Sequence, residues 1–330
     1  MSQRLVRAWY EGHPLLWLLW PVALLYGLVT GVRRLLYAGG VLRSRSFPVP
    51  VIIIGNITVG GTGKTPLTLA LIDFLRAQGY RPGVVSRGYG GRTTYPCLLS
   101  GSSTAAEVGD EPYALYQRSG VPVVVDPLRV RAVSHLLART DCNVVLSDDG
   151  LQHYALGRDI EIVVVDGARG LGNRLLLPAG PLREPPSRLD EADLVVVNGD
   201  GDAGVPASRM LLQPQPWRPV SRDDPGADLP PPGCRVHAVA GIGNPLRFFS
   251  MLASQGFDVV PHAFADHHAY SAQDLAFDER LPIVMTEKDA VKCAGFAAEN
   301  WWYVPVQAEL PASFFDGVMQ ALHRWEKDHA

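Results

Sequence analysis

The chain has 330 residues, of which 47% are hydrophobic and 19% charged, enough for one large or two ordinary domains and too apolar for a disordered protein. Its formal net charge of −3 lacks the basic excess typical of general nucleic-acid binders, so we expect no nucleic-acid partner. Its four cysteines lie far apart, which predicts neither a metal site nor a disulfide framework and fits a reducing environment.

An uncharged apolar segment, residues 14–32, lies near the N-terminus. It is borderline for a membrane-spanning helix, which needs about 20 apolar residues, and no small-residue cleavage site of a signal peptide follows it. Aromatic residues within the segment and arginines after it favour a helix in the membrane interface. We therefore predict a membrane-associated region over residues 1–45. A helix buried in the protein's own core is the alternative.

A β-branched strand predicted over residues 49–54 leads into a glycine-rich loop and then a helix with apolar residues at helical spacing. This order is typical of a P-loop, in which backbone N–H groups and a helix N-terminus hold phosphate. Lys64 is expected to reach the β- and γ-phosphates and Thr65 to hold magnesium. The sequence thus predicts binding of ATP and Mg²⁺ by Thr58, Val59, Gly60, Gly61, Thr62, Gly63, Lys64 and Thr65.

Apolar runs and helical stretches alternate after the P-loop. Strands are predicted at residues 82–86, 121–125, 143–146, 160–165 and 194–197, with helices at 111–118 and 128–139 between them. Near-continuous apolar strands separated by helices predict a P-loop NTPase-like α/β fold, a parallel sheet with helices on both faces. We assign residues 46–204 to this core domain.

The remaining chain divides into two parts. Residues 205–234 are proline-rich and are predicted to form a linker, with a possible strand at 209–213. Residues 235–330 are predicted to form a smaller C-terminal α/β lobe. Its expected strands cover 236–240, 257–260, 283–286 and 302–306, and its expected helices cover 245–252 and 311–326.

Acidic residues stand at two positions that suggest chemistry. Asp148 and Asp149 follow an apolar strand, where a carboxylate can hold the magnesium of a P-loop site; a solvated turn is the alternative. Asp110, followed by Glu111, precedes a predicted helix. It is either a helix N-cap or a catalytic base for an acceptor hydroxyl, and spacing alone favours the cap.

Other polar residues are weaker candidates. Asp266, His267 and His268 could bind a metal, relay protons or contact phosphate. The cationic candidates for contact with an anionic ligand, each also compatible with solvated surface, are Arg87, Arg129 and Arg183.

Taken together, several segments resemble the tetraacyldisaccharide 4′-kinase family, the lipid A 4′-kinases of Gram-negative bacteria. The match runs in order from about residue 10 to residue 310. It is carried by residues 55–56 with 58–66, SRGYGG (86–91), GDEP (109–112), DDGLQH (148–153), LPAGPLREP (177–185), GIGNP (241–245), DHH (266–268) and TEKDAVK (286–292). Thr58, which replaces the usual leading glycine of a P-loop, agrees with this family.

The resemblance implies transfer of the γ-phosphate of ATP to the 4′-hydroxyl of a tetraacylated glucosamine disaccharide 1-phosphate, giving lipid IVA. It implies two α/β lobes with the site between them. It also implies a peripheral or monotopic protein on the cytoplasmic face of the bacterial inner membrane. The expected partners are the lipid A disaccharide precursor and the membrane surface, with no obligate protein partner.

The resemblance also assigns residues. Asp110 is matched to the family's base-like aspartate and His267 to its partner from the second lobe, with His268 as the alternative. Asp148 and Asp149 are matched to the magnesium-side pair. The residues expected to contact substrate or phosphate are Arg87, Glu111, Arg129, His153, Arg183 and His268.

Two other functions are compatible with a P-loop. A switch or assembly ATPase would hydrolyse ATP and act through a partner protein, but the partitioning type carries a lysine where this chain has Val59. A soluble ligase or small-molecule kinase would bury the first apolar helix. Phosphorylation of a lipid A precursor distinguishes these functions from a lipid kinase.

Overall fold

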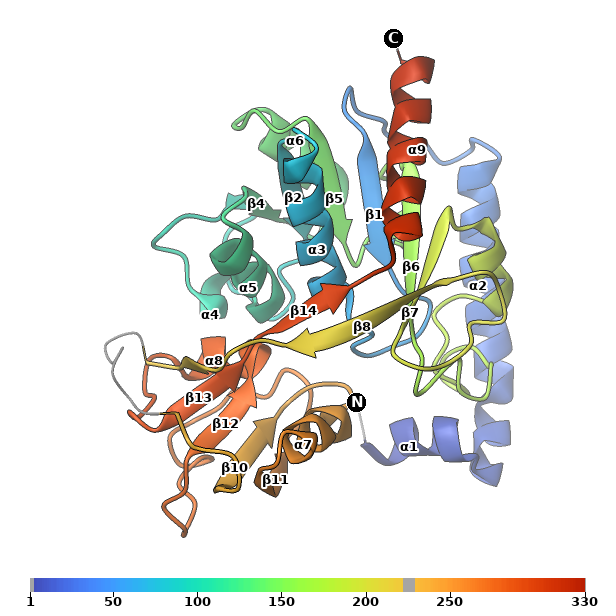
Figure 1. Cartoon of the computed structure of the whole chain (residues 1–330). Helices are drawn as coiled ribbons and strands as arrows, with labels where there is room; N and C mark the ends of the chain where they lie inside the picture. The colour runs from blue at the N-terminus through green and yellow to red at the C-terminus, as the bar shows by residue number, and fades with distance from the viewer. Residues whose placement is uncertain (1–2, 222–228, 330) are drawn as a thin grey trace.

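Nine strands form the larger of two sheets in the computed structural model, which describes residues 3–221 and 229–329 (Figure 1). Most neighbouring strands are parallel; β3 and β14, at the two edges, are antiparallel to their neighbours. The P-loop strand β1 is the middle strand. The order across the sheet is β14 (Val306–Glu309), β8 (Ser208–Pro214), β7 (Leu194–Asn198), β6 (Ile160–Asp166), β1 (Val51–Gly55), β5 (Val144–Asp148), β2 (Pro82–Ser86), β4 (Val123–Val125) and β3 (Cys97–Leu98).

Both faces of this sheet are buried, as its near-continuous apolar strands predict. Side chains alternate across a strand, so Ile52 and Ile54 pack on one face and Ile53 on the other. Helices α3 (Lys64–Ala77), α5 (Asp110–Ser119) and α9 (Ala312–Asp328) cover the first face, with the short helix α4 (Ala105–Val108) beside α5. Helix α6 (Arg129–Leu137), the loops after β5 and β6, and the 3-10 turn η2 (Pro186–Glu191) cover the second. The predicted doubly covered α/β fold is confirmed.

A smaller five-stranded sheet forms the second lobe. Its order is β11 (Asp258–Ala263), β10 (Arg235–Ala240), β12 (Ile283–Thr286), β13 (Trp301–Val304) and β9 (Arg218–Pro219), with β9 antiparallel to β13. Helix α7 (Pro245–Ser254) packs on β10 and β11, and α8 (Glu287–Cys293) follows β12 directly.

The division between the lobes differs from the predicted one. Strand β8, inside the predicted linker 205–234, pairs with β7 and extends the first sheet. Strand β14 and helix α9, inside the predicted lobe 235–330, return to the first lobe, where Phe314, Val318 and Leu322 are fully buried. Apolar spacing predicts a strand or helix but does not say which sheet it joins. Residues 222–228 of the predicted linker lie outside the described residues.

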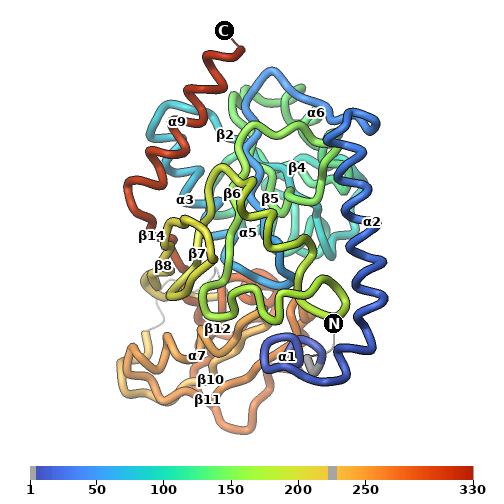
Figure 2. The backbone as a smooth tube through the Cα atoms, turned by 90° about the vertical axis from the view of Figure 1, so that its right-hand side faces the viewer, coloured from blue at the N-terminus to red at the C-terminus, as the bar shows by residue number. Residues whose placement is uncertain are grey.

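The N-terminal region forms α1 (Gln3–Glu11), the 3-10 turn η1 (Pro14–Leu19) and the long helix α2 (Trp20–Ala38), which lies along the first lobe (Figure 2). The inner side of α2 carries small and polar residues: Ala23 is buried, and a side chain at Gly27 would collide with Leu176. Its outer side is apolar and exposed, as at Leu28 (64%) and Leu35 (71%). The alternative of a helix buried in the protein's own core is therefore wrong.

Candidate active site

The P-loop between β1 and α3 takes a shape that two glycines make possible. Gly60 and Gly63 both have φ of +98°, the left-handed region that side chains disfavour. A Cβ on Gly63 would also lie 2.3 Å from Asn198 Nδ2. That amide nitrogen donates a hydrogen bond to the Thr62 carbonyl over 2.9 Å. Asn198, at the end of strand β7, therefore supports the P-loop through this hydrogen bond.

Arg169 ties the P-loop to the second lobe. Its guanidinium donates to the carbonyl of Gly61 in the P-loop and to the carbonyl of Gly243, 3.4 Å away, in the turn before α7. Asp166, at the end of β6, accepts from Arg169 Nε over 3.1 Å and fixes its orientation. The two backbones are so close that a Cβ on Gly243 would lie 2.7 Å from the Gly61 nitrogen. The two lobes therefore meet at the P-loop itself.

Lys64, the first residue of α3, points across the site. Its Nζ lies 3.3 Å from Asn56 Oδ1 and 3.3 Å from Asp149 Oδ1. Thr65 follows it and lines a cavity between the lobes. The predicted loop residues from Gly61 to Thr65 line that cavity, whereas Thr58 is buried and pairs with Leu182.

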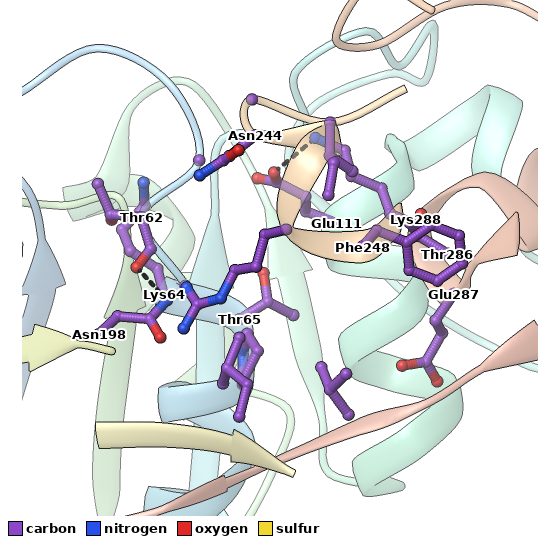
Figure 3. A pocket seen from close by; sticks show the side chains of 18 of the residues that line it. Thr62, Lys64, Thr65, Glu111, Asn198, Asn244, Phe248, Thr286, Glu287 and Lys288 are labelled. Carbon is purple, nitrogen blue, oxygen red and sulfur yellow. Dashed lines mark hydrogen bonds and ion pairs between the residues drawn. The ribbon is translucent and has the colours of Figure 1, made fainter. Parts of the chain in front are cut away.

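The first cavity, of about 280 Å³, lies between the P-loop and the second lobe. In Figure 3 the P-loop residues lie on one side and Phe248, Thr286 and Glu287 on the other. Apolar side chains also line it, from Leu69, Leu212, Ile242, Met251, Val304 and Val306, together with charged ones such as Arg118, Asp166 and Arg247. A glycine-rich phosphate loop that opens on an apolar slot suits a nucleotide, with its phosphates on the loop and its base in the slot.

The second cavity, of about 490 Å³, adjoins the first and is strongly polar. The two cavities share four lining residues, Gly61, Lys64, Glu111 and Asp266. Helix α2 contributes Tyr26, whose hydroxyl donates to the Arg183 carbonyl over 3.1 Å. The predicted site residues that line this cavity are Gly60, Gly61, Lys64, Arg87, Glu111, Arg129, Asp148, Asp149, His153, Arg183 and His267.

Asp148 and Asp149 have opposite electrostatic environments. Burial, and then the Glu111 carboxylate, raise the pKa of Asp148 to about 7. Burial alone would raise the pKa of Asp149 as well, but Lys64 and Arg183 outweigh it and hold that pKa well below its usual range. Asp148 Oδ1 is buried and has no hydrogen-bond partner within residues 3–221 and 229–329. A carboxylate in this state is a suitable ligand for a cation.

The second cavity also carries buried cationic side chains. Arg129 is 2% exposed, and burial lowers its pKa only to about 10, so it stays cationic at neutral pH. Burial, followed by Arg129 and Arg87, lowers the pKa of His153 to about 4, which leaves that imidazole neutral. The four cations that line the cavity, Lys64, Arg87, Arg129 and Arg183, equal its four carboxylates in number and offer donors to an anionic ligand.

Asp110 and His267 come together from different lobes. His267 Nδ1 lies 3.5 Å from Asp110 Oδ2, while Lys292 Nζ of α8 lies 3.6 Å from the same oxygen. Asp110 is the first residue of α5 rather than its N-cap, which is Gly109. His268 turns away, with Nε2 3.5 Å from Asp274 Oδ2, and lines neither cavity. The structure thus places His267, and not His268, beside Asp110.

Sequence reasoning gave no role to several residues of the site. Lys288 and Lys292 project from α8 toward Glu111 and Asp110, and their spacing of four residues, which puts two side chains on one helix face, was the available signal. Asn198 is the last residue of β7, as Asp148 is of β5, at the carboxyl edge where ligands of parallel sheets gather.

Comparisons with known proteins agree with this geometry. The family model described as tetraacyldisaccharide-1-P 4′-kinase matches residues 15–323. A tetraacyldisaccharide 4′-kinase of Pseudomonas putida is 51% identical over 328 residues, covering 98% of both chains. One of Nitrosococcus oceani is 50% identical over 336 residues, covering 99% of this chain and 96% of its own.

A solved structure is also similar. The crystal structure of LpxK from Aquifex aeolicus in complex with ATP is 28% identical, with a TM-score of 0.78, over 93% of this chain and 99% of its own. A family match over nearly the whole chain, relatives at half identity and the same fold lead to one conclusion: this chain belongs to the tetraacyldisaccharide-1-P 4′-kinase family.

Proposed function

We propose that this protein transfers the γ-phosphate of ATP to the 4′-hydroxyl of a tetraacyldisaccharide 1-phosphate and so forms lipid IVA in lipid A biosynthesis. One observation carries the proposal: a nucleotide-sized cavity with apolar walls around the P-loop and a cavity lined by charged groups meet at Lys64 and Glu111. The donor phosphate and the acceptor hydroxyl can therefore react where the cavities join. The related Aquifex protein, which was crystallised in complex with ATP, supports the donor half.

The P-loop residues hold the donor in this proposal. Backbone N–H groups around Gly61 and Gly63 and the N-terminus of α3 bind the phosphates. In the structure Lys64 lies between Asn56 and Asp149. In the proposed reaction its ammonium contacts the γ-phosphate and offsets the negative charge that grows on the phosphate during transfer. Substrate binding then replaces an internal ion pair with a contact to the reacting group.

The residues at the junction fit Mg²⁺. Hard oxygen ligands suit this ion, and the buried Asp148 Oδ1 is without a partner in the described part of the chain. Thr65, Asp148 and Asp149 would hold the ion. When bound, it neutralises phosphate oxygens. Ser86 supports the site because its hydroxyl donates to Asp148 Oδ2 over 3.3 Å.

We infer that Asp110 accepts the proton of the acceptor hydroxyl. His267 Nδ1 and Lys292 Nζ both approach Oδ2 of Asp110, so Oδ1 is the oxygen that can face the substrate. Arg87, Arg129 and Arg183 line the same cavity and would hold the phosphorylated sugar. Because His267 comes from the second lobe, the base is complete only when the lobes are together.

The N-terminal helix accounts for access to a lipid substrate. The outer side of α2 is apolar and exposed, while Arg33 on its inner side donates to the Gln152 carbonyl over 3.2 Å. A helix bound along its length to a polar lobe can bury only its outer side in lipid, which favours a position in the interface. Tyr26 of this helix lines the acceptor cavity, so the sugar can reach the site while its acyl chains stay in the membrane. We place the protein on the cytoplasmic face, where ATP is available.

Lipid phosphorylation tests this proposal directly. Purified protein is incubated with γ-labelled ATP, Mg²⁺ and tetraacyldisaccharide 1-phosphate in mixed micelles, and the lipid fraction is analysed for labelled lipid IVA. We expect labelled product that disappears in the Lys64→Met variant. ATP hydrolysis without labelled lipid would support a switch ATPase instead.

A further inference from the structure

One face of helix α7, in the second lobe, lines the first cavity. Arg247, Phe248 and Met251 contribute to this lining, since residues three or four apart share a face of a helix. Arg247 is the charged member of the three. A Cβ added to Gly199, in the first lobe, would lie 3.0 Å from Arg247 Nη2. The guanidinium therefore extends from the second lobe to the backbone of the first.

The end of this arginine lies close to the P-loop. Gly199 comes directly after Asn198, the residue whose amide donates to the Thr62 carbonyl. Arg247 lines the first cavity but not the second, whereas Lys64 lines both. A phosphate tail on the P-loop would therefore have Lys64 at the end where the cavities join and Arg247 nearer the base.

Arg247 differs from the other cations of the first cavity in having no counter-ion. Each of those cations has a nitrogen within 3.3 Å of a carboxylate oxygen; the pairs are Lys64 with Asp149, Arg118 with Glu287 and Lys288 with Glu111. The side chain of Arg247 forms neither an ion pair nor a hydrogen bond with any residue in 3–221 or 229–329. Its N–H donors are therefore not used by the described part of the chain.

Asp166 does not supply the missing partner, although its charge attracts Arg247. Its Oδ1 accepts from the Ala168 N–H over 3.0 Å, and its Oδ2 accepts from Arg169 Nε over 3.1 Å. Burial lowers the pKa of Arg247; Asp166 opposes this shift, and Arg169 adds to it. Because an arginine stays protonated in proteins, the cavity holds a half-buried cation whose donors suit a negatively charged ligand.

We propose that Arg247 is the second lobe's contact to the phosphate tail of the nucleotide, binding the α- or β-phosphate while the P-loop holds the same tail from the first lobe. The inference rests on the proposed function only in taking the first cavity as the nucleotide site. A guanidinium presents paired N–H donors that match two phosphate oxygens. Both phosphates remain on ADP after transfer, so the contact strengthens the binding of ATP and ADP alike.

Nucleotide binding by the full-length protein tests this contact without a lipid substrate. ATP and ADP are titrated with Mg²⁺ present by calorimetry, and adenosine by NMR, for the wild type and Arg247→Met. We expect the Kd for ATP and for ADP to rise about 30-fold, because a charge-assisted hydrogen-bonded pair is lost, and the Kd for adenosine to stay within about twofold. An unchanged Kd for ADP, or an equal loss for adenosine, overturns the proposal.

A second measurement separates this role from a structural one. Because the described part of the chain gives Arg247 no counter-ion, its removal should not lower the unfolding temperature of the nucleotide-free protein. Arg247→Lys keeps the charge but loses the paired donors, so its Kd for ADP should lie between those of the wild type and Arg247→Met. A nucleotide-free Arg247→Met that unfolds well below the wild type would mean that Arg247 supports the fold, and would contradict the proposal.

Arg235→Met is the matched control. Arg235 belongs to the same lobe, lines neither cavity and donates to Glu279 Oε2 over 3.0 Å. We expect its Kd for ADP to match that of the wild type. A loss as large as that of Arg247→Met would mean that the net charge of the lobe, and not a contact by Arg247, holds the phosphates.

The same titrations separate this inference from the proposed function. A wild type that bound neither ATP nor ADP would disprove the nucleotide site itself. Wild-type binding that persisted unchanged in Arg247→Met would disprove the role of Arg247 alone.

Discussion

The two cavities at the lobe junction differ in the kind of side chain that lines them. The first is lined by apolar side chains from both lobes, such as Phe248 and Leu212, around the backbone of the P-loop. The second is lined mainly by polar and charged groups of the first lobe, such as Arg129 and Asp149, and by Tyr26 of helix α2. In the proposed function, the first cavity recognises the shape of the base and a phosphate tail, whereas the second recognises charge.

This difference separates binding from chemistry. Apolar contacts to a nucleotide base are the same before and during phosphoryl transfer, so weakening them should raise KM with little effect on kcat. Charges around the reacting groups act most strongly on the transition state, so removing them should lower kcat. Each substitution in the site below tests whether the change affects mainly the kinetic parameter, KM or kcat, that is expected for that part of the site.

The largest effect is expected beside the second cavity, at Asp110, whose neighbours Glu111 and His267 line it. Asp110→Asn removes the proton acceptor but keeps the side-chain shape beside His267 Nδ1. We expect kcat to fall about 10³-fold with the affinity for ATP unchanged within about twofold. Labelled-lipid kinetics and nucleotide titration measure the two quantities. Activity within tenfold of the wild type would exclude Asp110 as the base.

A smaller effect is expected at the outer side of α2, which the proposed function places in the membrane interface. Leu25→Glu combined with Leu28→Glu places charges on the exposed outer side of α2, where these residues are 60% and 64% exposed. We expect binding to anionic lipid vesicles to weaken by a factor on the order of 100, because two leucines leave the lipid. Vesicle co-sedimentation measures it.

The control for that experiment is a charge on another exposed leucine. Leu246→Glu, on a residue 71% exposed in the second lobe, should bind vesicles like the wild type. Deletion of the whole N-terminal region would be less informative, because Trp9 is buried and donates to the Pro178 carbonyl over 3.0 Å. Equal loss of binding in both substituted proteins would place the membrane contact elsewhere.

At the nucleotide cavity the expected effect is smaller again. Phe248→Leu keeps an apolar side chain of similar size but removes the aromatic ring that faces the P-loop across the cavity (Figure 3). We expect the KM for ATP to rise about fivefold, from loss of stacking with the base, and kcat to stay within about twofold. Steady-state kinetics with each substrate varied in turn measures this. A change confined to the lipid KM would reverse our assignment of the two cavities.

The features predicted from sequence are those in which a short segment determines its own structure. The P-loop is predictable because Gly60, Gly63 and Lys64 act within one strand–loop–helix unit, and Asp148 follows its own strand. The roles proposed for these residues remain predictions until measured. Their positions around one junction agree with the family that the sequence resembles.

Features that depend on pairing distant segments were not predictable. Strand β14 joins the first sheet through β8, nearly a hundred residues earlier in the chain, because their edges match and not because of a local pattern. The contacts of Lys288 with Glu111 and Asp266 likewise require two lobes to meet. Such contacts depend on the tertiary arrangement, which periodicity in a single sequence does not record.

The last expected effect concerns the stability of the proposed metal-binding pair, Asp148 and Asp149. The pKa of Asp148 is raised to about 7 in the folded protein by burial and Glu111, against a usual value near 4 for an unfolded chain. Between those two values the unfolded state loses its proton first, so ionisation of this group makes the Mg²⁺-free protein less stable as pH rises. The penalty is fully present above pH 7.

Asp148→Asn removes that penalty while keeping the size of the side chain. We expect the free energy of unfolding of the Mg²⁺-free protein to increase by a few kcal/mol at pH 8, since each unit of the shift corresponds to about 1.4 kcal/mol, and to change little at pH 4. Denaturant titrations at both values measure the difference. A variant less stable than the wild type at pH 8 would mean that the Asp148 carboxylate is already balanced by charge without the ion. In that case the negative electrostatic potential at the proposed cation site would be weaker than the unpaired Oδ1 of Asp148 indicates.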